Sequence, residues 1–571
     1  MAGRVKIAQF FFVALLALIG IRAFDLQILR PDTIISMAHK RFDHTIKLSP
    51  NRGTIYDKSG QPLAISLEVK SIAANPRLIE NPSWAASKIA GKLHIGKQPL
   101  KKKLSSDKYF VWIKRHATPD EVEAVKALNI RGIGYYNEAK RFYPESESLA
   151  NVLGIVGIDG QGLEGIELLF DRVLKGKPRH IEVHKDGLGR IIYARGLPSD
   201  EKKDGNTLWL TIDRRMQYIA SSKLEKAVRK NNASSGFIII TNPTTGEIYA
   251  MASYPSFNPN IGKYKRLDGH KNRGIVDIFE PGSVIKPFFI SWGLDNRVFK
   301  PTQSIFCEKG AYTYHRTTIH DHEKYGWLPV RDIVKYSSNI GMVKLFDPVH
   351  AVDMYSCLKG FGMVSPSGID YPGEPSALIR NPQNWTIVDK ANVAFGQGFA
   401  VSGIQLITAF NALVNGGMLM RPYLIEHIAD TTGKEIQCFR PTIISKVLSK
   451  ETSDEITSIL ASVCSKGGTA EAANIKNYRI FGKTGTSQKI DPLTGAYSKK
   501  DYTATFMGGV IDGGGKPKLT MIVSIDEPRP YYYASIVACP VFKEIVEECA
   551  SIMDLNPSIT VARKEVKDEG I

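Results

Sequence analysis

An apolar run from Ile7 to Ile21, interrupted by one glutamine, is the first pattern along the chain. Further apolar residues extend it to Leu29, which brings it to the roughly 20 residues that cross a bilayer. Positive charges before the run predict that the start stays cytoplasmic while the rest is exported. We therefore predict a cytoplasmic tail over 1–6 and a transmembrane anchor over 7–29. A cleaved signal peptide is the alternative, disfavoured because no small-x-small cleavage site directly follows the run.

From residue 30 to 206 the pattern changes to short extended segments separated by turns. His44–Leu48 and Thr54–Tyr56 are predicted strands because turn residues bound them. Thr118-Pro-Asp120 combines a capping residue with a proline, which predicts a short helix over Glu121–Leu128. These patterns predict a mixed, β-rich domain over 30–206.

Longer regular segments fill the chain from residue 207 to 555. Arg215–Arg229 has a helical pattern, and apolar runs bounded by turns predict strands. The predicted strands are Gly236–Thr241, Glu247–Ser253, Ala504–Val510 and Leu519–Ile525. A hairpin beside long helices predicts an α+β domain over 207–555, in which helices cover an antiparallel sheet. The charged tail over 556–571 is predicted to be disordered.

The chain has 571 residues and a formal net charge of +18. A basic chain can bind nucleic acid, an anionic membrane or an acidic polymer. Its densest basic cluster runs from Lys101 through Lys108 to Arg115, and we interpret this cluster as a solvated basic surface. Zinc-finger spacing and the aromatic–basic signature of RNA-binding sheets are both missing from the sequence, so we expect no nucleic-acid partner.

Six cysteines lie in the second half of the chain, and no two are spaced as Cys-x-x-Cys. This spacing argues against a metal centre and against thioredoxin chemistry. The even count permits a disulfide in an oxidising compartment, but buried free thiols are the state we expect. His320-Asp-His322 has no further ligand pattern that would close a metal site, so we expect this segment to order a loop.

Pro281-Gly-Ser283-Val-Ile-Lys286 is the first segment with a pattern of catalytic chemistry. Pro-Gly predicts a turn, and the apolar residues from Val284 to Leu294 predict a buried helix after it. A serine and a lysine three positions apart share one helix face, so Lys286 can serve as the base for the Ser283 hydroxyl. Burial or a nearby positive charge would lower the lysine pKa, as this role requires.

Spacing alone does not single out this pair. Ser105–Lys108 and Ser199–Lys202 have the same serine–lysine spacing, but both lie in polar, loop-like sequence. Pro287 would be costly inside a helix, yet a proline is tolerated in the first turn, where we expect it. The apolar helix therefore distinguishes Ser283 from the other two serines.

Ser337-Ser-Asn339 is the second motif and follows a helical pattern over Val330–Tyr336. Ser337 can relay a proton between lysines and a leaving group. Asn339 can hold a substrate amide with its paired donor and acceptor. A loop that ends a helix, without catalytic function, is the alternative interpretation of this triplet.

Lys-Thr-Gly occurs once in the chain, at Lys483, Thr484 and Gly485, and Thr486 follows it. A strand of this kind can take a substrate backbone as an additional strand, and the glycine permits close approach. The lysine supplies positive charge for a carboxylate, which both threonine hydroxyls can also bind. If Lys483 lies near Lys286, it would lower the pKa of that residue.

Serine-x-x-lysine, serine-x-asparagine and lysine-threonine-glycine, in this order, resemble the signature of the penicillin-recognising serine enzymes. The resemblance covers nearly the whole chain and is closest to the class B penicillin-binding proteins. The segments that carry it further are Arg52–Asp57, Arg141–Pro144, Gly162–Glu167, Phe395–Gly398, Asn415–Gly417 and Ala538–Phe542. Within this class, His320–His322 and Ser337–Met342 look most like the division-specific penicillin-binding protein 3 type.

The resemblance implies a serine β-lactamase-like catalytic domain and a peptidoglycan D,D-transpeptidase. The implied catalytic residues are Ser283, Lys286, Ser337, Asn339 and Lys483, and the implied substrate-binding residues are Thr484, Gly485 and Thr486. Ser283 would attack the penultimate D-Ala carbonyl of a stem peptide, and an amine of a neighbouring stem would then take the acyl group. The backbone N–H groups of Ser283 and Thr486 would form the oxyanion hole.

The resemblance implies no metal and no organic cofactor. Its implied partners are stem peptides ending in D-Ala-D-Ala, β-lactams as covalent inhibitors, the membrane, and division-complex proteins. Among the last is a membrane glycosyltransferase of the shape, elongation, division and sporulation type. The implied location is the bacterial inner membrane, with the bulk of the chain in the periplasm.

Several alternatives share part of these features. An elongation-specific class B enzyme is the nearest, and a D,D-carboxypeptidase would use water as acceptor. A β-lactamase would not need the long module between anchor and catalytic domain, and a class A protein would need a glycosyltransferase domain there. A penicillin-sensing receptor would carry further membrane segments and a signalling domain. Three intact motifs argue against an inactive division scaffold.

Overall fold

The computed structural model describes residues 2–29, 43–48, 50–177, 179–185, 191–195, 204–261, 267–315, 317–491 and 494–557. These residues form two compact units. The first is drawn from Met1–Asn51 and Lys175–Gly205, and the second from Arg52–Leu174 and Asn206–Ile571. The predicted disordered tail lies, from residue 558 onward, outside the described residues.

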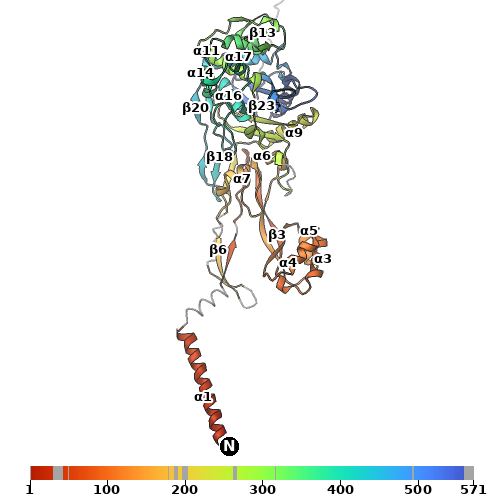
Figure 1. The fold of residues 1–571 in the computed structure, drawn as a ribbon, viewed down its shortest axis with the longest axis vertical. Helices are drawn as coiled ribbons and strands as arrows, with labels where there is room; N and C mark the ends of the chain where they lie inside the picture. Colours follow the sequence, from red (N-terminus) through yellow and green to blue (C-terminus); the bar gives the residue numbers. More distant parts are fainter. Residues whose placement is uncertain are drawn as a thin grey trace, which may run out of the picture. The chain divides into compact units, whose positions relative to one another are not determined.

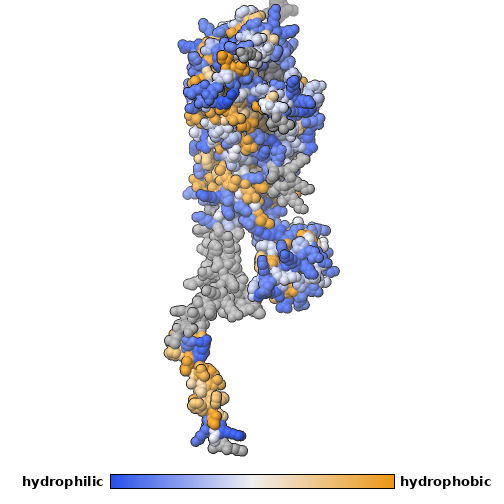
Figure 2. Space-filling model, in the orientation of Figure 1, coloured by the Kyte–Doolittle hydropathy of each residue, from blue (hydrophilic) through white to orange (hydrophobic). Residues whose placement is uncertain are grey.

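The first unit begins with a long apolar helix, α1, over Ala2–Phe24, which continues as a π-helical turn over Asp25–Leu29. Within the described residues, Gly3–Ile28 is the one segment that is long and apolar enough to cross a membrane, with a mean hydropathy of 2.2. Its large apolar side chains are exposed, and Figure 2 shows them as a hydrophobic column that ends in hydrophilic residues. This helix includes the predicted anchor.

The first unit also contains a three-stranded antiparallel sheet. Its strands are β1 (Asp43–Leu48), β6 (Arg179–Lys185) and β7 (Ile191–Arg195), in the order β1-β6-β7. The predicted strand His44–Leu48 corresponds to β1.

The pedestal part of the second unit is built around one long strand, β3 (Pro62–Ala74). β5 (Ile133–Phe142) pairs along one side of it, β4 (Val111–Ala117) pairs with its second half from the opposite side, and β2 (Ile55–Tyr56) pairs with its first residues. All three pairings are antiparallel. β3 is therefore the scaffold on which the rest of this part is assembled.

Three helices gather on one side of β3 (Figure 1) and enclose a core of their own. They are α3 (Pro82–Leu93), α4 (Lys97–Leu104) and α5 (Pro119–Lys126). The predicted helix near residue 121 is α5. The Thr118 hydroxyl accepts from the Glu121 N–H, and the glutamate carboxylate accepts in return from the Thr118 N–H.

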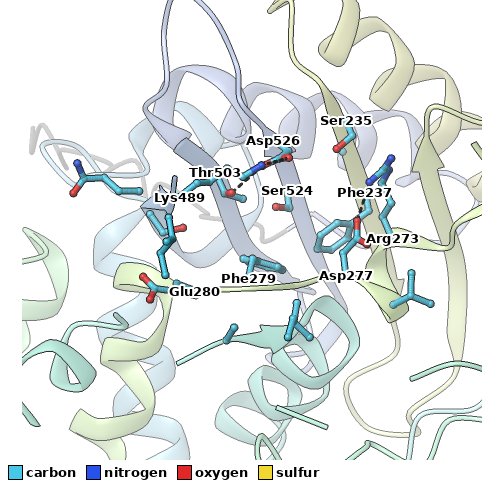
Figure 3. Close-up of a pocket in the computed structure, with 17 residues that line it drawn as sticks. Ser235, Phe237, Arg273, Asp277, Phe279, Glu280, Lys489, Thr503, Ser524 and Asp526 are labelled. Carbon is cyan, nitrogen blue, oxygen red and sulfur yellow. Dashed lines mark hydrogen bonds and ion pairs between the residues drawn. The ribbon is translucent and has the colours of Figure 1, made fainter. Parts of the chain in front are cut away.

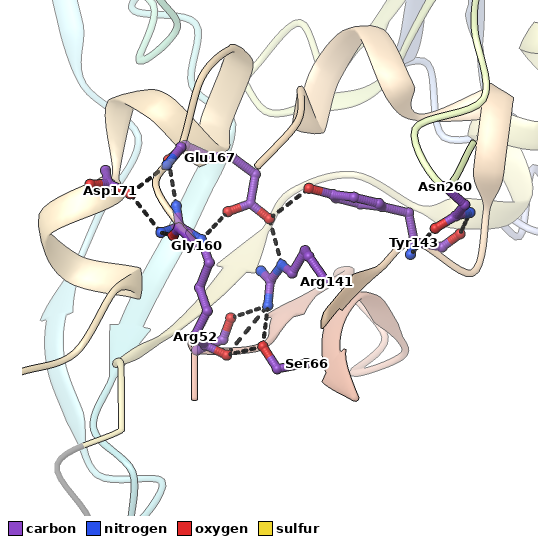
Figure 4. A network of polar contacts seen from close by, with 10 residues as sticks. Arg52, Ser66, Arg141, Tyr143, Gly160, Glu167, Asp171 and Asn260 are labelled. Atoms are coloured by element: carbon purple, nitrogen blue, oxygen red, sulfur yellow. Dashed lines mark hydrogen bonds and ion pairs between the residues drawn. The ribbon is translucent and has the colours of Figure 1, made fainter. Parts of the chain in front are cut away.

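A buried network of ion pairs joins distant segments of the pedestal part (Figure 4). Glu167 is fully buried and accepts from Arg52 Nε at 2.5 Å and from Arg141 Nε at 2.6 Å. Arg52 also pairs with Asp171 at 2.6 Å and donates to the Gly160 carbonyl at 3.1 Å. A buried carboxylate is stable only when paired and hydrogen-bonded. The three pedestal segments that carry the family resemblance therefore meet in one structural network.

The pedestal sheet continues into the catalytic part of the chain. β2 pairs in parallel with β8 (Thr207–Leu210), β8 pairs with β18 (Ile425–Ala429), and β18 pairs with β19 (Glu435–Cys438). The resulting seven-stranded sheet spans both sides of the boundary predicted near residue 206.

A five-stranded antiparallel sheet forms the centre of the catalytic part. Its order is β10-β9-β23-β22-β21, so β21 is an edge strand. The strands are β9 (Ser235–Thr241), β10 (Ile248–Tyr254), β21 (Arg479–Ile490), β22 (Tyr497–Ile511) and β23 (Pro517–Asp526). The predicted strands are confirmed, as is the predicted α+β class with an antiparallel sheet covered by helices.

Helices pack against this sheet and against one another. α9 (Arg214–Lys230) contacts β10 and packs on α19 (Cys539–Cys549), while α16 (Gly403–Val414), buried along its length, contacts β9 and β23. The remaining longer helices are α11 (Lys286–Asp295), α12 (Val330–Lys335), α13 (Asn339–Phe346), α14 (Ala351–Gly360), α15 (Ile387–Ala394) and α17 (Lys450–Val463). α11 contacts α12, α14, α16 and α17, which makes it the central helix of this layer.

The six cysteines are all free thiols, as expected. Five are buried, and Cys438 on the edge strand β19 is exposed. The thiols therefore contribute mainly to the core.

Candidate active site

Ser283 lies in a short 3₁₀ turn, Gly282–Ile285, and α11 begins directly after it at Lys286. Pro287 falls in the first turn of α11, as predicted, where a missing N–H costs little. Gly282 has φ +58° and its N–H donates to the Gly396 carbonyl at 2.9 Å. The turn is thus fixed on both sides of the serine.

Gly485 lets strand β21 lie directly against this turn. A Cβ atom at Gly485 would lie 2.8 Å from Val284 Cγ1 and 3.0 Å from the Pro281 carbonyl oxygen, which is closer than side chains tolerate. The close approach that the sequence predicted for a substrate is therefore already made here by the turn that carries Ser283.

Lys286 is fully buried and reaches the second motif. Its Nζ donates to the Ser337 carbonyl at 2.6 Å, to Asn339 Oδ1 at 2.7 Å and, at 3.3 Å, to Ser337 Oγ. In the described part of the chain no hydrogen bond joins Lys286 to the Ser283 hydroxyl. Its role as the base for Ser283 therefore stays a prediction.

Lys483, on strand β21, approaches Ser337, which Lys286 also contacts. This lysine is also fully buried, and its Nζ lies 2.9 Å from Ser337 Oγ and 3.0 Å from the Thr484 carbonyl. The Ser337 hydroxyl thus lies between the side-chain nitrogens of two lysines, the position that a proton relay requires.

Both lysines have lowered pKa values. Burial is the main cause for each, because it disfavours the charged form. It lowers the pKa of Lys483 to about 7, and it lowers the pKa of Lys286 well below its usual 10.5. The positive charge of Lys483 lowers the Lys286 pKa further, as the sequence predicted, and Asp321 opposes this shift.

Asp321 holds the second motif in place. Its carboxylate accepts from the Ser338 hydroxyl at 2.5 Å, from the Asn339 N–H at 2.5 Å and from the Ile340 N–H at 3.0 Å. The last two groups are free donors of the first turn of α13. The loop-ordering role expected for His320–His322 is thus carried by the aspartate at its centre.

Backbone geometry at the second motif is unusual. Ser337 has φ +63°, in the left-handed region that costs a non-glycine residue about 1 kcal/mol or more. Lys286 binds the Ser337 carbonyl, and the Asn339 side chain donates from Nδ2 to the His320 carbonyl at 3.0 Å. The Asn339 amide oxygen is occupied by Lys286, so its remaining N–H is the part left for a substrate.

The third motif runs along the outer edge of the sheet. Thr484 Oγ1 donates to Thr469 Oγ1 at 3.3 Å, and Thr486 Oγ1 accepts from the Ala534 N–H at 3.3 Å. Among the described residues no strand pairs with the free side of β21. A strand edge of this kind can add an extended peptide.

Aromatic rings lie near this strand, because Tyr502 pairs with Gln488 of β21, and Tyr532 and Tyr533 come just before Ala534. Tyr532 stacks on Tyr502 with ring centroids 4.1 Å apart, and Tyr533 meets the ring of His322 edge-on at 5.3 Å. The packing that the sequence predicted for these tyrosines holds for Tyr532, while Tyr531 and Tyr533 are exposed and Tyr533 makes its ring contacts at the surface.

A cavity of about 580 Å³ lies beside the turn, against the end of the five-stranded sheet (Figure 3). Phe237, Phe279 and Lys489 line it, together with Glu280, three residues before Ser283. Glu280 Oε1 accepts from the Gly398 N–H at 2.9 Å, and burial raises the pKa of this carboxyl. None of the predicted catalytic residues lines this cavity, so we do not assign the reaction to it.

The structure brings all three predicted motifs together, and it adds residues that the sequence did not single out for chemistry. These are Asp321, Glu280 and Gly396. In the sequence, Asp321 is marked only by its position between two histidines, a pattern that is also typical of a metal site. Within the described residues, no group of three or more histidine, cysteine, aspartate or glutamate side chains could hold a metal ion.

Comparison with protein families gives two matches. Residues 236–547 match the penicillin binding protein transpeptidase domain, and residues 47–210 match the penicillin-binding protein dimerisation domain. The chain belongs to the penicillin-binding protein transpeptidase family. This pair of domains is the class B architecture that the sequence motifs indicated, and all five predicted catalytic residues lie within the transpeptidase match.

Individual relatives agree with this assignment. The peptidoglycan D,D-transpeptidase FtsI of Escherichia coli K12 is 31% identical over 555 residues, which cover 95% of this chain and 91% of the relative. The probable peptidoglycan D,D-transpeptidase PenA of Neisseria meningitidis is 30% identical over 570 residues, covering 99% and 95%. Penicillin binding protein 3 of Mycobacterium tuberculosis, solved with aztreonam, has the same fold, with a TM-score of 0.69 at 24% identity, covering 90% and 99%.

Proposed function

We propose that this class B penicillin-binding protein is a peptidoglycan D,D-transpeptidase that cross-links stem peptides at the division septum. The observation that carries the proposal is the Ser337 hydroxyl held between two buried lysines, 3.3 Å from Lys286 Nζ and 2.9 Å from Lys483 Nζ. An ordinary core would not bury two lysines, because charged groups lose their hydration there. The names of the relatives from Escherichia coli and Neisseria meningitidis support the same activity.

The reaction begins with acylation of Ser283. Lys286, neutral because its pKa is lowered, takes the hydroxyl proton while the oxygen attacks the carbonyl carbon of the penultimate D-Ala. The backbone N–H groups of Ser283 and Thr486 receive the oxyanion. The peptide bond to the terminal D-Ala then breaks, and its nitrogen leaves with a proton delivered through Ser337.

Substrate recognition takes place on strand β21. Lys483, with the hydroxyls of Thr484 and Thr486, binds the terminal carboxylate, and Gly485 lets the strand lie against the turn that carries Ser283. The remaining N–H of Asn339 donates to the substrate amide. In the second half, the amine of a neighbouring stem attacks the acyl-ester carbon, the ester bond to Ser283 breaks, and the serine recovers a proton. β-Lactams mimic the D-Ala-D-Ala end and trap the serine as an acyl-enzyme.

The proposed location is the inner membrane, with α1 as a single span and the rest of the chain in the periplasm. Residues 1–6 then form the cytoplasmic end, because positive charges favour that side. The proposed partners are stem peptides and the division complex, including a membrane glycosyltransferase that supplies glycan strands to this enzyme.

Covalent labelling tests the central step. After incubation with a labelled penicillin, mass spectrometry is expected to find the added mass on the Ser283 peptide and to find none in Ser283→Ala. Ser105→Ala is the matched control, because Ser105 has the same spacing to a lysine but lies in the loop after α4. Label on another serine would contradict the assignment.

Product analysis tests the reaction class. With stem pentapeptides and an acceptor amine, we expect cross-linked dimers to exceed hydrolysed tetrapeptides. Hydrolysis alone would identify a D,D-carboxypeptidase instead. Localisation of a tagged chain separates the division role from elongation. A division enzyme is expected at the septum, and an elongation enzyme along the lateral wall.

A further inference from the structure

One basic and aromatic segment of the pedestal part has no role in the active site. Lys101, Lys102 and Lys103 form the last turn of α4, and Lys108, Tyr109 and Phe110 follow in the loop that leads into β4. All six are exposed. We call these six residues the basic–aromatic rim.

The local fold forces these residues outward. Leu100 and Leu104 of α4 are buried in the core of the three helices, so the lysines between them face solvent. Phe110 is 43% exposed, yet its ring is held edge-on against Trp112, with centroids 4.8 Å apart, and against Tyr136 at 5.4 Å. Its place on the surface is therefore fixed by packing.

Tyr109 is the most exposed ring of the rim, at 69%. The guanidinium of Arg77 lies over it, 4.0 Å from the ring centroid, and Arg77 also pairs with Asp107 at 2.8 Å. Both aromatic side chains are thus presented to solvent in ordered positions. Burying such rings on binding costs little conformational entropy.

The charges of the rim are largely uncompensated. In the part of the chain that the structure describes, Lys101, Lys102 and Lys108 have no ion pair, while Lys103 donates to the Trp112 carbonyl at 3.0 Å. Residues 76–131 contain 12 Lys and Arg against 5 Asp and Glu, a net charge of +7 out of the chain's +18. One tenth of the chain therefore carries more than a third of its net charge.

We propose that the basic–aromatic rim binds the anionic phospholipid surface of the membrane in which α1 anchors the chain. This inference rests on the membrane location proposed above. Lysines near an anionic leaflet are attracted to it, and aromatic rings bind at the headgroup level. Because α1 belongs to the same chain, the membrane is present at a high effective concentration. A surface of six residues can therefore bind it, although such a small surface would bind weakly by itself.

Photo-crosslinking in nanodiscs tests this contact with the full chain. p-Benzoylphenylalanine replaces Tyr109, and lipid adducts are counted by mass spectrometry in discs with 30% phosphatidylglycerol and in discs of phosphatidylcholine alone. We expect lipid adducts at 109 in the anionic discs and several-fold fewer in the neutral ones. The same probe at Tyr218, which is 62% exposed on α9, is the background.

Charge variants give the matched comparison. Each lysine at an anionic surface contributes about a factor of five to binding, so Lys101→Gln, Lys102→Gln and Lys108→Gln together are expected to weaken the contact about a hundredfold. Adducts at 109 should then fall to the background level. Lys434→Gln, Lys466→Gln and Lys476→Gln remove the same charge from exposed positions elsewhere and should leave the adducts unchanged.

Three results would overturn the proposal: adducts at 109 no higher than at 218, equal adducts in both kinds of disc, or adducts to a second copy of the chain in place of lipid. A probe at Phe12 reports on the anchor itself. Lipid adducts at 12 without adducts at 109 would refute the rim and leave the anchor standing. Adducts at 109 without adducts at 12 would refute the anchor and leave the contact between the rim and lipid standing.

Discussion

Replacing Lys483 by methionine tests whether this lysine binds the substrate carboxylate as a cation. Its pKa of about 7 lies far below the usual 10.5, and about 1.4 kcal/mol corresponds to each pH unit of that difference. Holding the charge in the free enzyme therefore costs about 5 kcal/mol. A penicillin carboxylate supplies the missing partner, so the charged form is the one that binds.

The pH profile of acylation should therefore depend on the protonation of Lys483. The second-order rate constant for acylation reports ionisations of the free enzyme, so it should fall above pH 7 by up to tenfold per pH unit as Lys483 loses its proton. Lys483→Met is expected to be about 10–100-fold slower at pH 6, because a hydrogen bond to a charged group is worth about 1.5–3 kcal/mol. At pH 9, where the native lysine is itself neutral, the two rates should approach each other.

A second consequence concerns Lys286. The positive charge of Lys483 lowers the Lys286 pKa, so removing that charge should move the rising, low-pH limb of the profile to higher pH. Stopped-flow acylation by a fluorescent penicillin between pH 5 and 10 measures both limbs. Lys489→Met, the same change on the same strand at a lysine paired with Asp526, is the control and should keep both limbs. A constant ratio of variant to native rates from pH 6 to 9 would refute the reasoning.

Three further changes probe the supports of the site. Asp321→Asn keeps an acceptor but loses its charge, so we expect a loss of about 1–3 kcal/mol in unfolding free energy and slower acylation, measured by thermal denaturation and labelling. A Cβ at Gly396 would lie 2.0 Å from the Gly282 carbonyl oxygen, whereas the space at Gly398 is open, and both have positive φ. Gly396→Ala should therefore lose acylation that Gly398→Ala retains. Glu167→Gln breaks a buried double ion pair and should lower the unfolding free energy by about 3–5 kcal/mol, while the folded fraction acylates at the native rate.

Local patterns predicted the individual elements of this fold. Strand β9 contains the uninterrupted apolar run Phe237–Ile240, β23 is mostly apolar, and α5 has its cap and proline in the sequence order that defines a helix start. Such signals depend on neighbouring residues only. They also predicted which serine lies directly before an apolar helix, and hence which of three equally spaced pairs to choose.

Pairing between distant segments could not be predicted in this way. Strand β8 pairs with β2 in the pedestal and with β18, more than 200 residues later, because the sheet selects neighbours by shape and burial. Asp321 is similar: its three hydrogen bonds reach residues 17 to 19 positions onward. A lone aspartate in a polar segment has no periodic signal that would reveal such partners.

The two lysines show where local rules fail for a functional reason. Lys286 and Lys483 have no exposed surface, although lysine is among the side chains least often buried without a charge partner. Their hydrogen bonds go to neutral oxygens of Ser337, Asn339 and Thr484, which satisfy donors without neutralising charge. A carboxylate partner would have stabilised the fold but would have raised the pKa of both lysines. Because the hydrogen-bond partners of the two lysines carry no negative charge, one amine stays available as a base and a place remains for the carboxylate of the substrate.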